Sequence, residues 1–191
     1  MSFISNFTIL YAGTFGRVNG IGYVIDLASK IYSLDPSIVF VLIGDGIEKQ
    51  TIIEQAKEKN IFDKNIFILE SVSKKELPQL YYECNMGSSF VIPIKELWAN
   101  SANKYFDTLA AAKPILINYE GWQKVEILKE NVGYVLPVKI SDKAIKKFIS
   151  YTKETLLHTR QKENAINLAK KNYSLNKAIE KYKNIFDKFE N

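Results

Sequence analysis

Six short runs of apolar residues alternate with stretches of helical periodicity along most of this chain, and no other feature restricts its fold as much. The runs are rich in β-branched and aromatic residues, as buried strands are. They span Phe7–Ala12, Ile38–Ile43, Asn65–Leu69, Met86–Ile92, Ile115–Ile117 and Gly133–Val138. Strands that alternate with helices predict an α/β fold with an open, mostly parallel six-stranded sheet and helices on both faces.

The chain changes character after Val138. Three helices and no strand are predicted beyond it, over Ser141–Leu157, Thr159–Lys171 and Leu175–Phe189. Residues 139–191 carry 13 Lys and Arg against 6 Asp and Glu, whereas residues 1–138 carry 13 against 15. A chain of 191 residues is most simply one domain, here an α/β core over 7–138 with a basic helical extension over 139–191. The basic surplus predicts either a solvated lysine face or contact with an anionic membrane or lipid phosphate. No nucleic-acid partner is expected, because no recognition motif accompanies the charge.

The scarcity of cysteine and histidine excludes several kinds of site. Cys84 is the only cysteine, which rules out an internal disulfide and fits a reducing, cytoplasmic compartment. His158 is the only histidine, so neither a histidine-based catalytic triad nor a multi-histidine metal site is expected. No apolar run reaches the length of a membrane span, and the N-terminus has no basic-then-apolar signal layout.

A polar stretch before the fifth run has the features of an anion-binding helix start. Asn100 or Ser101 can cap its first turn, and the N–H groups of residues 102–104 would then point out of the helix, where an anion is stabilised. Asn103 and Asp107 are four residues apart and share a face, where a carboxylate can accept hydrogen bonds from sugar hydroxyls. The stretch therefore indicates a sugar-nucleotide seat, with diphosphate at the helix start and ribose on Asp107. A polar-capped helix without a ligand fits the stretch equally well.

The first predicted strand leads into a glycine-rich loop from Gly13 to Gly20. A strand, a glycine loop and a helix form the arrangement that brings backbone N–H groups close to a phosphate. The glycine spacing matches neither the dinucleotide fingerprint nor the P-loop, so the loop alone is a weak signal. Ligands on such sheets bind beyond the carboxyl ends of the strands. The segments predicted at such ends are the Gly13–Gly20 loop, the Gly44–Gly46 turn, the Glu70–Ser73 loop and the helix start at Ser101.

The helix start also carries a family resemblance. The stretch Asn103-Lys104-x-Phe106-Asp107-x-x-Ala110-Ala111-x-Lys113-Pro114 resembles the NKLFDYMAAGKP segment of retaining glycosyltransferases of family 4, or group 1, which have the GT-B fold and build bacterial O-antigen and capsule sugars. The first loop, with Tyr11-x-Gly13 and a later glycine, is similar to the first loop of their C-terminal half. The resemblance covers residues 7–189 and implies the donor-binding half, a Rossmann-like domain that holds a nucleotide-sugar, most commonly a UDP-sugar.

The resemblance implies a donor site built from three parts of the chain. Its residues are Gly13, Thr14 and Arg17 in the first loop, Val72 in the loop after the third strand, and Ser101, Ala102, Asn103, Lys104 and Asp107 at the helix start. Asp107 is assigned to the ribose, and Ser101 to Lys104 are assigned to the diphosphate. No catalytic residue, metal ligand or cofactor is implied in this half, because the helix dipole and basic side chains stabilise the leaving diphosphate.

The chain departs from the commonest family pattern at two places. Many members carry Arg after the first glycine of the loop and Lys before the last, both on the donor diphosphate, where this chain has Thr14 and Asn19. Many members also carry a second acidic residue eight positions before the one at the ribose, where this chain has Ala99. Either Glu96 contacts the donor sugar instead, or backbone groups replace the contact, which is the alternative we favour.

In the resembling enzymes an acceptor-binding half brings the nucleophilic hydroxyl, and that half is absent from this chain. We therefore expect a domain that binds the nucleotide-sugar donor of an enzyme whose acceptor is a surface polysaccharide or a lipid-linked sugar. The domain alone should transfer no sugar. It should work with an acceptor half or a partner chain at the inner face of the cytoplasmic membrane. The alternative is a non-catalytic nucleotide-binding or interaction module that acts as a subunit. A dinucleotide oxidoreductase would need the fingerprint that is missing. A receiver-type signalling domain would need an acidic cluster after the first strand, and residues 13–20 contain none.

Overall fold

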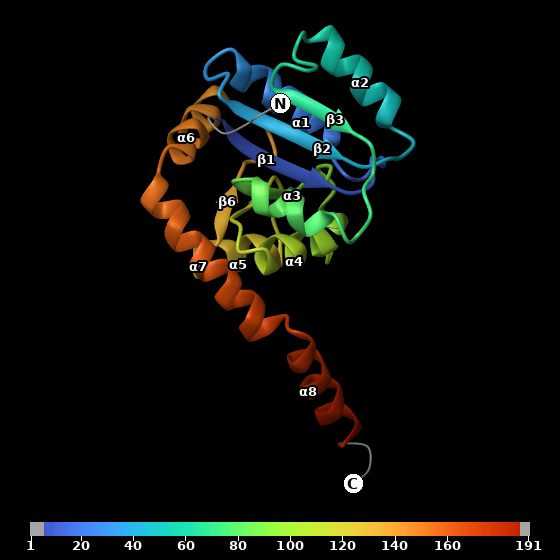
Figure 1. The fold of residues 1–191 in the computed structure, drawn as a ribbon, viewed down its shortest axis with the longest axis vertical. Helices are drawn as coiled ribbons and strands as arrows, with labels where there is room; N and C mark the ends of the chain where they lie inside the picture. Colours follow the sequence, from blue (N-terminus) through green and yellow to red (C-terminus); the bar gives the residue numbers. More distant parts are fainter. Residues whose placement is uncertain (1–5, 188–191) are drawn as a thin grey trace.

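A six-stranded sheet forms the centre of the structure, a computed structural model that describes residues 6–187 (Figure 1). The strands are β1 Phe7–Ala12, β2 Ile38–Ile43, β3 Ile66–Leu69, β4 Met86–Ser89, β5 Ile115–Ile117 and β6 Gly133–Val135. Their order is β3-β2-β1-β4-β5-β6, and all neighbouring strands are parallel. The predicted open six-stranded sheet is confirmed, and it is wholly rather than mostly parallel. The strand order reverses between β1 and β4, so a ligand is expected outside the carboxyl ends of these strands.

Helices cover both faces of the sheet, as predicted. On one face lie α1 Ile21–Tyr32, α2 Lys49–Glu58 and α6 Asp142–Thr152. On the other face lie α3 Leu77–Glu83, α4 Asn103–Ala110, α5 Trp122–Glu130 and α7 Thr155–Asn172. Alternate residues of β1 divide between the two cores: Ile9 and Tyr11 pack with α1, whereas Leu10 packs with Tyr81 of α3.

Three helices follow β6, and their bounds differ from those that the sequence predicts. The predicted break at His158, between the helices expected over Ser141–Leu157 and Thr159–Lys171, is wrong: α6 ends at Thr152, and α7 runs without a break from Thr155 to Asn172. The N–H of Thr155 donates to the carbonyl of Lys153 (3.1 Å) and closes a tight turn between the two helices. The turn contains no glycine or proline, so the sequence does not predict a helix end at this position. The apolar spacing continues across this turn, which is why the sequence indicates one helix.

The last helix, α8 Leu175–Phe186, projects beyond the rest of the domain (Figure 1). Figure 1 shows α7 running along one side of the sheet and its flanking helices, and α8 continuing past them. The predicted helix end at Phe189 lies outside the described residues. No helix in the described part of the chain is both long and apolar enough to cross a bilayer.

Candidate functional site

Helix α4 begins at Asn103, with Ala102 in the N-cap position and no side-chain cap. The predicted cap by Asn100 or Ser101 is therefore wrong. The side chain of Asn100 instead accepts a hydrogen bond from the N–H of Ala102 (3.2 Å) in the preceding loop. The N–H groups of Asn103 and Lys104 remain at the helix start without an intrahelical acceptor. The helix start thus offers two N–H groups to an anion, rather than the three that the sequence predicts, and Ser101 lies exposed beside them.

Buried contacts on the opposite side fix the orientation of α4. Tyr105, Thr108 and Leu109 are fully buried in the core. The hydroxyl of Tyr105 donates to the Glu126 carboxylate on α5 (2.7 Å), and the same oxygen accepts a second hydrogen bond from Tyr173 at the end of α7 (2.7 Å). Because α4 is held on this side by α5 and α7, the polar residues of its first two turns face outward from the sheet.

Asn103 and Asp107 line one surface pocket of about 400 Å³, as their spacing predicts. The pocket is completed by Lys74, Leu77, Pro78, Tyr81, Ala110 and Ala111. Partial burial raises the pKa of the Asp107 carboxyl, and the ammonium groups of Lys74 and Lys104 lower it. Within residues 6–187 the Asp107 carboxylate makes no hydrogen bond or ion pair, so its oxygens are available to a ligand.

Lys104 lies between this pocket and the glycine loop that follows β1. Its ammonium group is 4.9 Å from the centroid of the Tyr11 ring, which is a cation–π contact. It also lies against Gly13, where an added β-carbon would be only 2.9 Å from the Lys104 nitrogen. Burial lowers the pKa of Lys104, and the charge of Asp107 raises it. No described carboxylate forms an ion pair with Lys104, so its ammonium group can bind an anion placed beside Gly13, and the nearby charge of Asp107 offsets only part of its positive charge.

A second pocket, of about 360 Å³, adjoins the first at the carboxyl ends of β1, β2 and β3. It is lined by Ala12, Gly13, Thr14, Ile43, Gly44, Asp45, Ser71, Val72 and Leu77. Leu77 lines both pockets, so they are neighbours at this edge of the sheet. All the donor residues that the sequence predicts, except Arg17, lie in these two pockets or at the helix start beside them.

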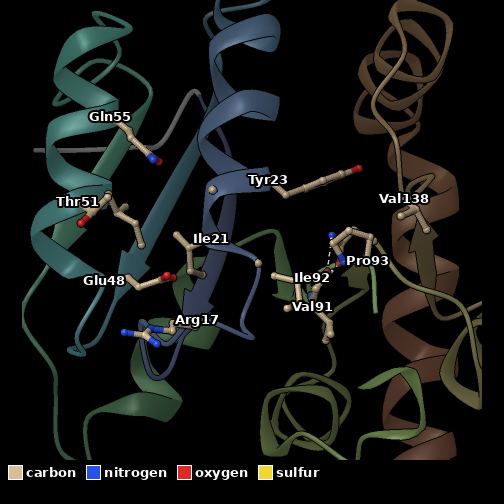
Figure 2. A pocket seen from close by; sticks show the side chains of 14 residues that line it. Arg17, Ile21, Tyr23, Glu48, Thr51, Gln55, Val91, Ile92, Pro93 and Val138 are labelled. Carbon is tan, nitrogen blue, oxygen red and sulfur yellow. Dashed lines mark hydrogen bonds between the residues drawn. The ribbon is translucent and has the colours of Figure 1, made fainter. Parts of the chain in front are cut away.

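Arg17 lies in a different pocket, of about 260 Å³, which Figure 2 shows. Arg17 is on the α2 side of this pocket with Glu48 and Thr51, and Tyr23 and Pro93 are on the other side (Figure 2). Helix α1 starts at this pocket, directly after Gly20, whose φ of 60° falls in the left-handed region that glycine adopts readily. The structure therefore does not bring Arg17 together with Lys104 and Asp107.

Lys74 is a pocket residue that is not among the site residues predicted from the sequence. It lines the pocket of Asp107, and its charge lowers the pKa of that carboxyl. Helix α3 begins only at Leu77, so Lys74 lies in the loop at the carboxyl edge of the sheet. The sequence feature that could have identified Lys74 is its position directly after the Glu70–Ser73 loop, which is predicted at the carboxyl end of a strand. Tyr81 also lines the pocket and carries no such signal, because its spacing is that of a core residue.

Glu96 and Ala99 both belong to a short 3₁₀ helix, η1 Lys95–Ala99, between β4 and α4. Both side chains are exposed. Neither residue lines any of the three pockets described above.

Comparisons with known proteins concern the family and the fold of the chain. The family described as "Glycosyl transferases group 1" matches residues 5–168. No curated protein matches the chain. Among solved structures, Anabaena HepE in complex with UDP aligns with a TM-score of 0.82 at 13% identity, over 97% of this chain and 50% of HepE. S. aureus TarM, in a complex that includes UDP, aligns with a TM-score of 0.79 at 14% identity, over 95% of this chain and 36% of TarM.

A structure of a single domain is also similar. The C-terminal domain of LpcC, a glycosyl transferase group 1 family protein from Francisella tularensis, aligns with a TM-score of 0.68 at 19% identity, over 88% of this chain and 87% of that domain. The chain thus spans about a third of TarM and half of HepE, but most of the isolated LpcC domain. These likenesses confirm the predicted fold, that of one half of a GT-B enzyme. Since the family match extends over most of its length, the chain belongs to the glycosyl transferases group 1 family.

Proposed function

We propose that this chain is the donor-binding domain of a retaining glycosyltransferase and that it holds a UDP-sugar. The observation that carries the proposal is the unpaired Asp107 carboxylate in one pocket, next to the unpaired Lys104 ammonium group beside the Gly13 backbone. A nucleoside diphosphate needs a hydrogen-bond acceptor for its ribose hydroxyls and hydrogen-bond donors for its phosphates, and these residues supply both kinds of group. Relatives of the same fold lend support, because HepE structures contain UDP and UDP-glucose.

In this proposal the ribose hydroxyls donate hydrogen bonds to Asp107. The diphosphate accepts hydrogen bonds from the N–H groups of Asn103 and Lys104 and from the Lys104 ammonium group. The other predicted residues surround these groups: Gly13, Thr14 and Val72 along the second pocket, and Ser101 and Ala102 at the helix start. Arg17 contributes only if its side chain turns from the pocket of Figure 2 toward Thr14.

The proposed reaction transfers the sugar with retention and without a metal ion. The leaving diphosphate carries the developing negative charge, and the start of α4 and the ammonium group of Lys104 stabilise it. The attacking hydroxyl comes from a surface-polysaccharide or lipid-linked acceptor of the O-antigen or capsule type, which an acceptor half or a partner chain positions on the cytoplasmic side of the membrane. The domain by itself holds the donor but does not transfer it, because proximity of the hydroxyl supplies much of the rate.

The proposal predicts that the chain binds UDP in the presence of EDTA. Isothermal titration calorimetry should give the same affinity within about twofold after magnesium is added, since N–H groups and Lys104 bind the diphosphate. Uridine, which has no phosphates, should bind at least about tenfold more weakly than UDP. UDP binding that requires magnesium, or uridine binding as tight as that of UDP, would contradict this assignment of the diphosphate.

A further prediction concerns the missing carboxylate of the family pattern. We expect Glu96→Gln to leave the affinities for UDP and for a UDP-sugar within about threefold, less than ~0.7 kcal/mol. The physical reason is that Glu96 lies exposed on η1 and lines none of the pockets, so backbone groups are left to make the sugar contact. An unchanged UDP affinity with a UDP-sugar affinity that falls tenfold or more would make Glu96 a sugar-binding residue.

The alternative is a non-catalytic nucleotide-binding module that acts as a subunit of a partner chain. The observation that favours it is the presence of Thr14 and Asn19 where many relatives carry the Arg and Lys of the donor diphosphate. Both functions predict UDP binding. They differ when an acceptor half is supplied, because only the transferase then releases UDP from a UDP-sugar in proportion to the glycosylated acceptor.

A further inference from the structure

Two side chains at the start of α5 hold the segment that leads into α4. The carbonyl oxygen of Asn100 accepts a hydrogen bond from the indole N–H of Trp122 (3.0 Å) and a second from the side-chain amide of Gln123. The same amide also donates to the side-chain oxygen of Asn100 (3.4 Å). Helix α5 packs directly on this segment, since a β-carbon added to Gly121 would collide with the carbonyl oxygen of Trp98. The start of α5 therefore fixes the position of Asn100.

Asn100 in turn holds the first residue of α4. Its side-chain oxygen accepts a hydrogen bond from the N–H of Ala102 (3.2 Å), which is the N-cap residue of the helix. The N–H groups of Asn103 and Lys104, which the proposed function assigns to the diphosphate, follow directly. A shift of Asn100 would change the direction of these N–H groups. Asp107 would be affected less, because it lies one turn further along, where buried side chains hold α4 in the core.

Only one end of the Gln123 amide has a partner in the described part of the chain. The residue is fully buried, and its side-chain oxygen makes no hydrogen bond there. The Asn100 carbonyl can only accept a hydrogen bond, so the amide nitrogen of Gln123 must face it and the oxygen must point away. A buried polar atom without a partner lowers stability, and an apolar side chain of similar length would avoid this cost. Stability alone therefore does not explain a glutamine at this position.

We propose that Gln123 and Trp122 are positioning residues for the donor diphosphate. Through the carbonyl of Asn100 they hold the start of α4 in the orientation that directs the N–H groups of Asn103 and Lys104 at the phosphates. Neither Gln123 nor Trp122 lines either of the two pockets assigned to UDP, so they act on the ligand through the backbone of residues 100–104. The inference rests on the proposed function, because the ligand that is positioned is the diphosphate of UDP.

Gln123→Met tests the proposal, because methionine keeps the length of the side chain and removes both the donor and the unpaired oxygen. The variant should bind UDP about fivefold to tenfold more weakly in calorimetry. Its affinity for uridine, which has no phosphates to place at the helix start, should stay within about twofold. The Tm should stay within about 3 °C of the wild-type value. Trp122→Phe, which keeps an aromatic ring but lacks the N–H, should also weaken UDP binding, and the double variant should weaken it more than either single variant.

Gln161→Met is the matched control. Gln161 is also buried, but both ends of its amide are paired: its oxygen accepts a hydrogen bond from the Tyr151 hydroxyl, and its nitrogen donates to the carbonyl of Gly133 (3.0 Å). The substitution leaves these partners unpaired, so the Tm should fall by roughly 4–8 °C. The ratio of UDP to uridine affinity should not change. The two buried glutamines are thus expected to differ, one affecting diphosphate binding and the other affecting stability.

Amide NMR spectra of the ligand-free chain give a readout that does not need UDP. Gln123→Met should shift the backbone amide signals of residues 102–104, and Gln161→Met should not. Unchanged signals at these residues would overturn the inference. UDP affinity equal to that of wild type in the double variant, or equal losses for UDP and uridine, would also overturn it and leave the proposed function intact. Failure of the wild-type chain to bind UDP would instead contradict the proposed function, and this inference with it.

Discussion

Replacing Asp107 by alanine should weaken UDP binding tenfold to a hundredfold. The carboxylate has no partner among the described residues, so in the complex its oxygens can accept both hydrogen bonds of a ribose diol. Hydrogen bonds to a charged acceptor contribute roughly 1.5–3 kcal/mol, which corresponds to this loss of affinity. Calorimetry with wild-type and variant protein measures it directly. Asp107→Asn, which keeps one acceptor oxygen but no charge, should fall between the two.

Asp26→Ala is the matched control for this variant. Asp26 also lies on a helix, but on α1, across the sheet from the Asp107 pocket, and its ion pair is with Lys59 (3.1 Å). Asp26→Ala should leave UDP affinity unchanged.

UDP affinity of the wild-type chain should also fall as the pH is lowered, because protonation of Asp107 removes the charged acceptor. Since partial burial raises the pKa of Asp107, the loss should begin at a higher pH than for a fully hydrated aspartate. Equal UDP affinities for wild type and Asp107→Ala would remove Asp107 from the ribose site.

Gly44→Ala should lower the free energy of unfolding by about 3 kcal/mol or more, and Gly22→Ala should not. Gly44 has a φ of +154°, and a β-carbon there would be 1.9 Å from the carbonyl oxygen of Gly13. The added β-carbon is fixed to the backbone of residue 44, and the atom that it meets is a backbone oxygen. Neither can rotate away as a side chain could, so the end of β1 or the end of β2 must move. Gly22 lies in α1 with open space around it, where the nearest atom to an added β-carbon is the Gln55 side-chain oxygen at 4.0 Å.

Alanine at position 22 should stabilise the chain by about 0.5–1 kcal/mol, because glycine is costly inside a helix. The two variants add the same methyl group, so urea denaturation and thermal melting compare the two local environments directly. For a domain of this size Gly44→Ala should lower Tm by roughly 6–12 °C. Similar unfolding midpoints for both variants would mean that Gly13 and Gly44 do not approach each other as described. Since both line the second pocket, a folded Gly44→Ala protein should also bind UDP more weakly.

The spacing of apolar residues is sufficient to predict most of the sheet. β1 and β2 have the bounds that the sequence predicts, because strands covered on both faces read as continuous apolar runs. The same reasoning predicts β4 too long: the predicted strand continues to Ile92, but β4 ends at Ser89. There the N–H of Val91 donates to the side chain of Asn118 (2.9 Å), 27 residues further along the chain. An apolar residue in the sequence indicates that the position is buried. Where a strand ends depends instead on which group its backbone N–H binds, and here that group is a side chain far along the chain.

The candidate site also has a part that the sequence predicts correctly and a part that it does not. Asn103 and Asp107 can be placed in one pocket from their spacing, because a helix fixes the geometry between positions four apart. The pocket into which the Arg17 side chain extends cannot be predicted from spacing, because Arg17 lies in a loop whose conformation depends on contacts with residues far along the chain. The N–H of Ile92 donates to the carbonyl of Val18 (3.1 Å) and holds that loop against the segment after β4. The local sequence therefore indicates a basic residue near the phosphates, and the tertiary structure directs it to the α2 side.

The position of β1 in the middle of the sheet affects the order in which the chain can fold during synthesis. β1 pairs with β2, where Phe7 is the partner of Ile38, and also with β4, where Ile9 is the partner of Met86, 77 residues later. Ribosomes add roughly 5–20 residues per second, so about 4–15 s separate the synthesis of β1 from that of its second neighbour. Until then one edge of an apolar strand is unpaired, and such edges are where nascent chains aggregate. The contact between Ile92 and Val18 becomes possible only after β4 is made, so the glycine loop can take its final shape only when the second edge of β1 is also closed.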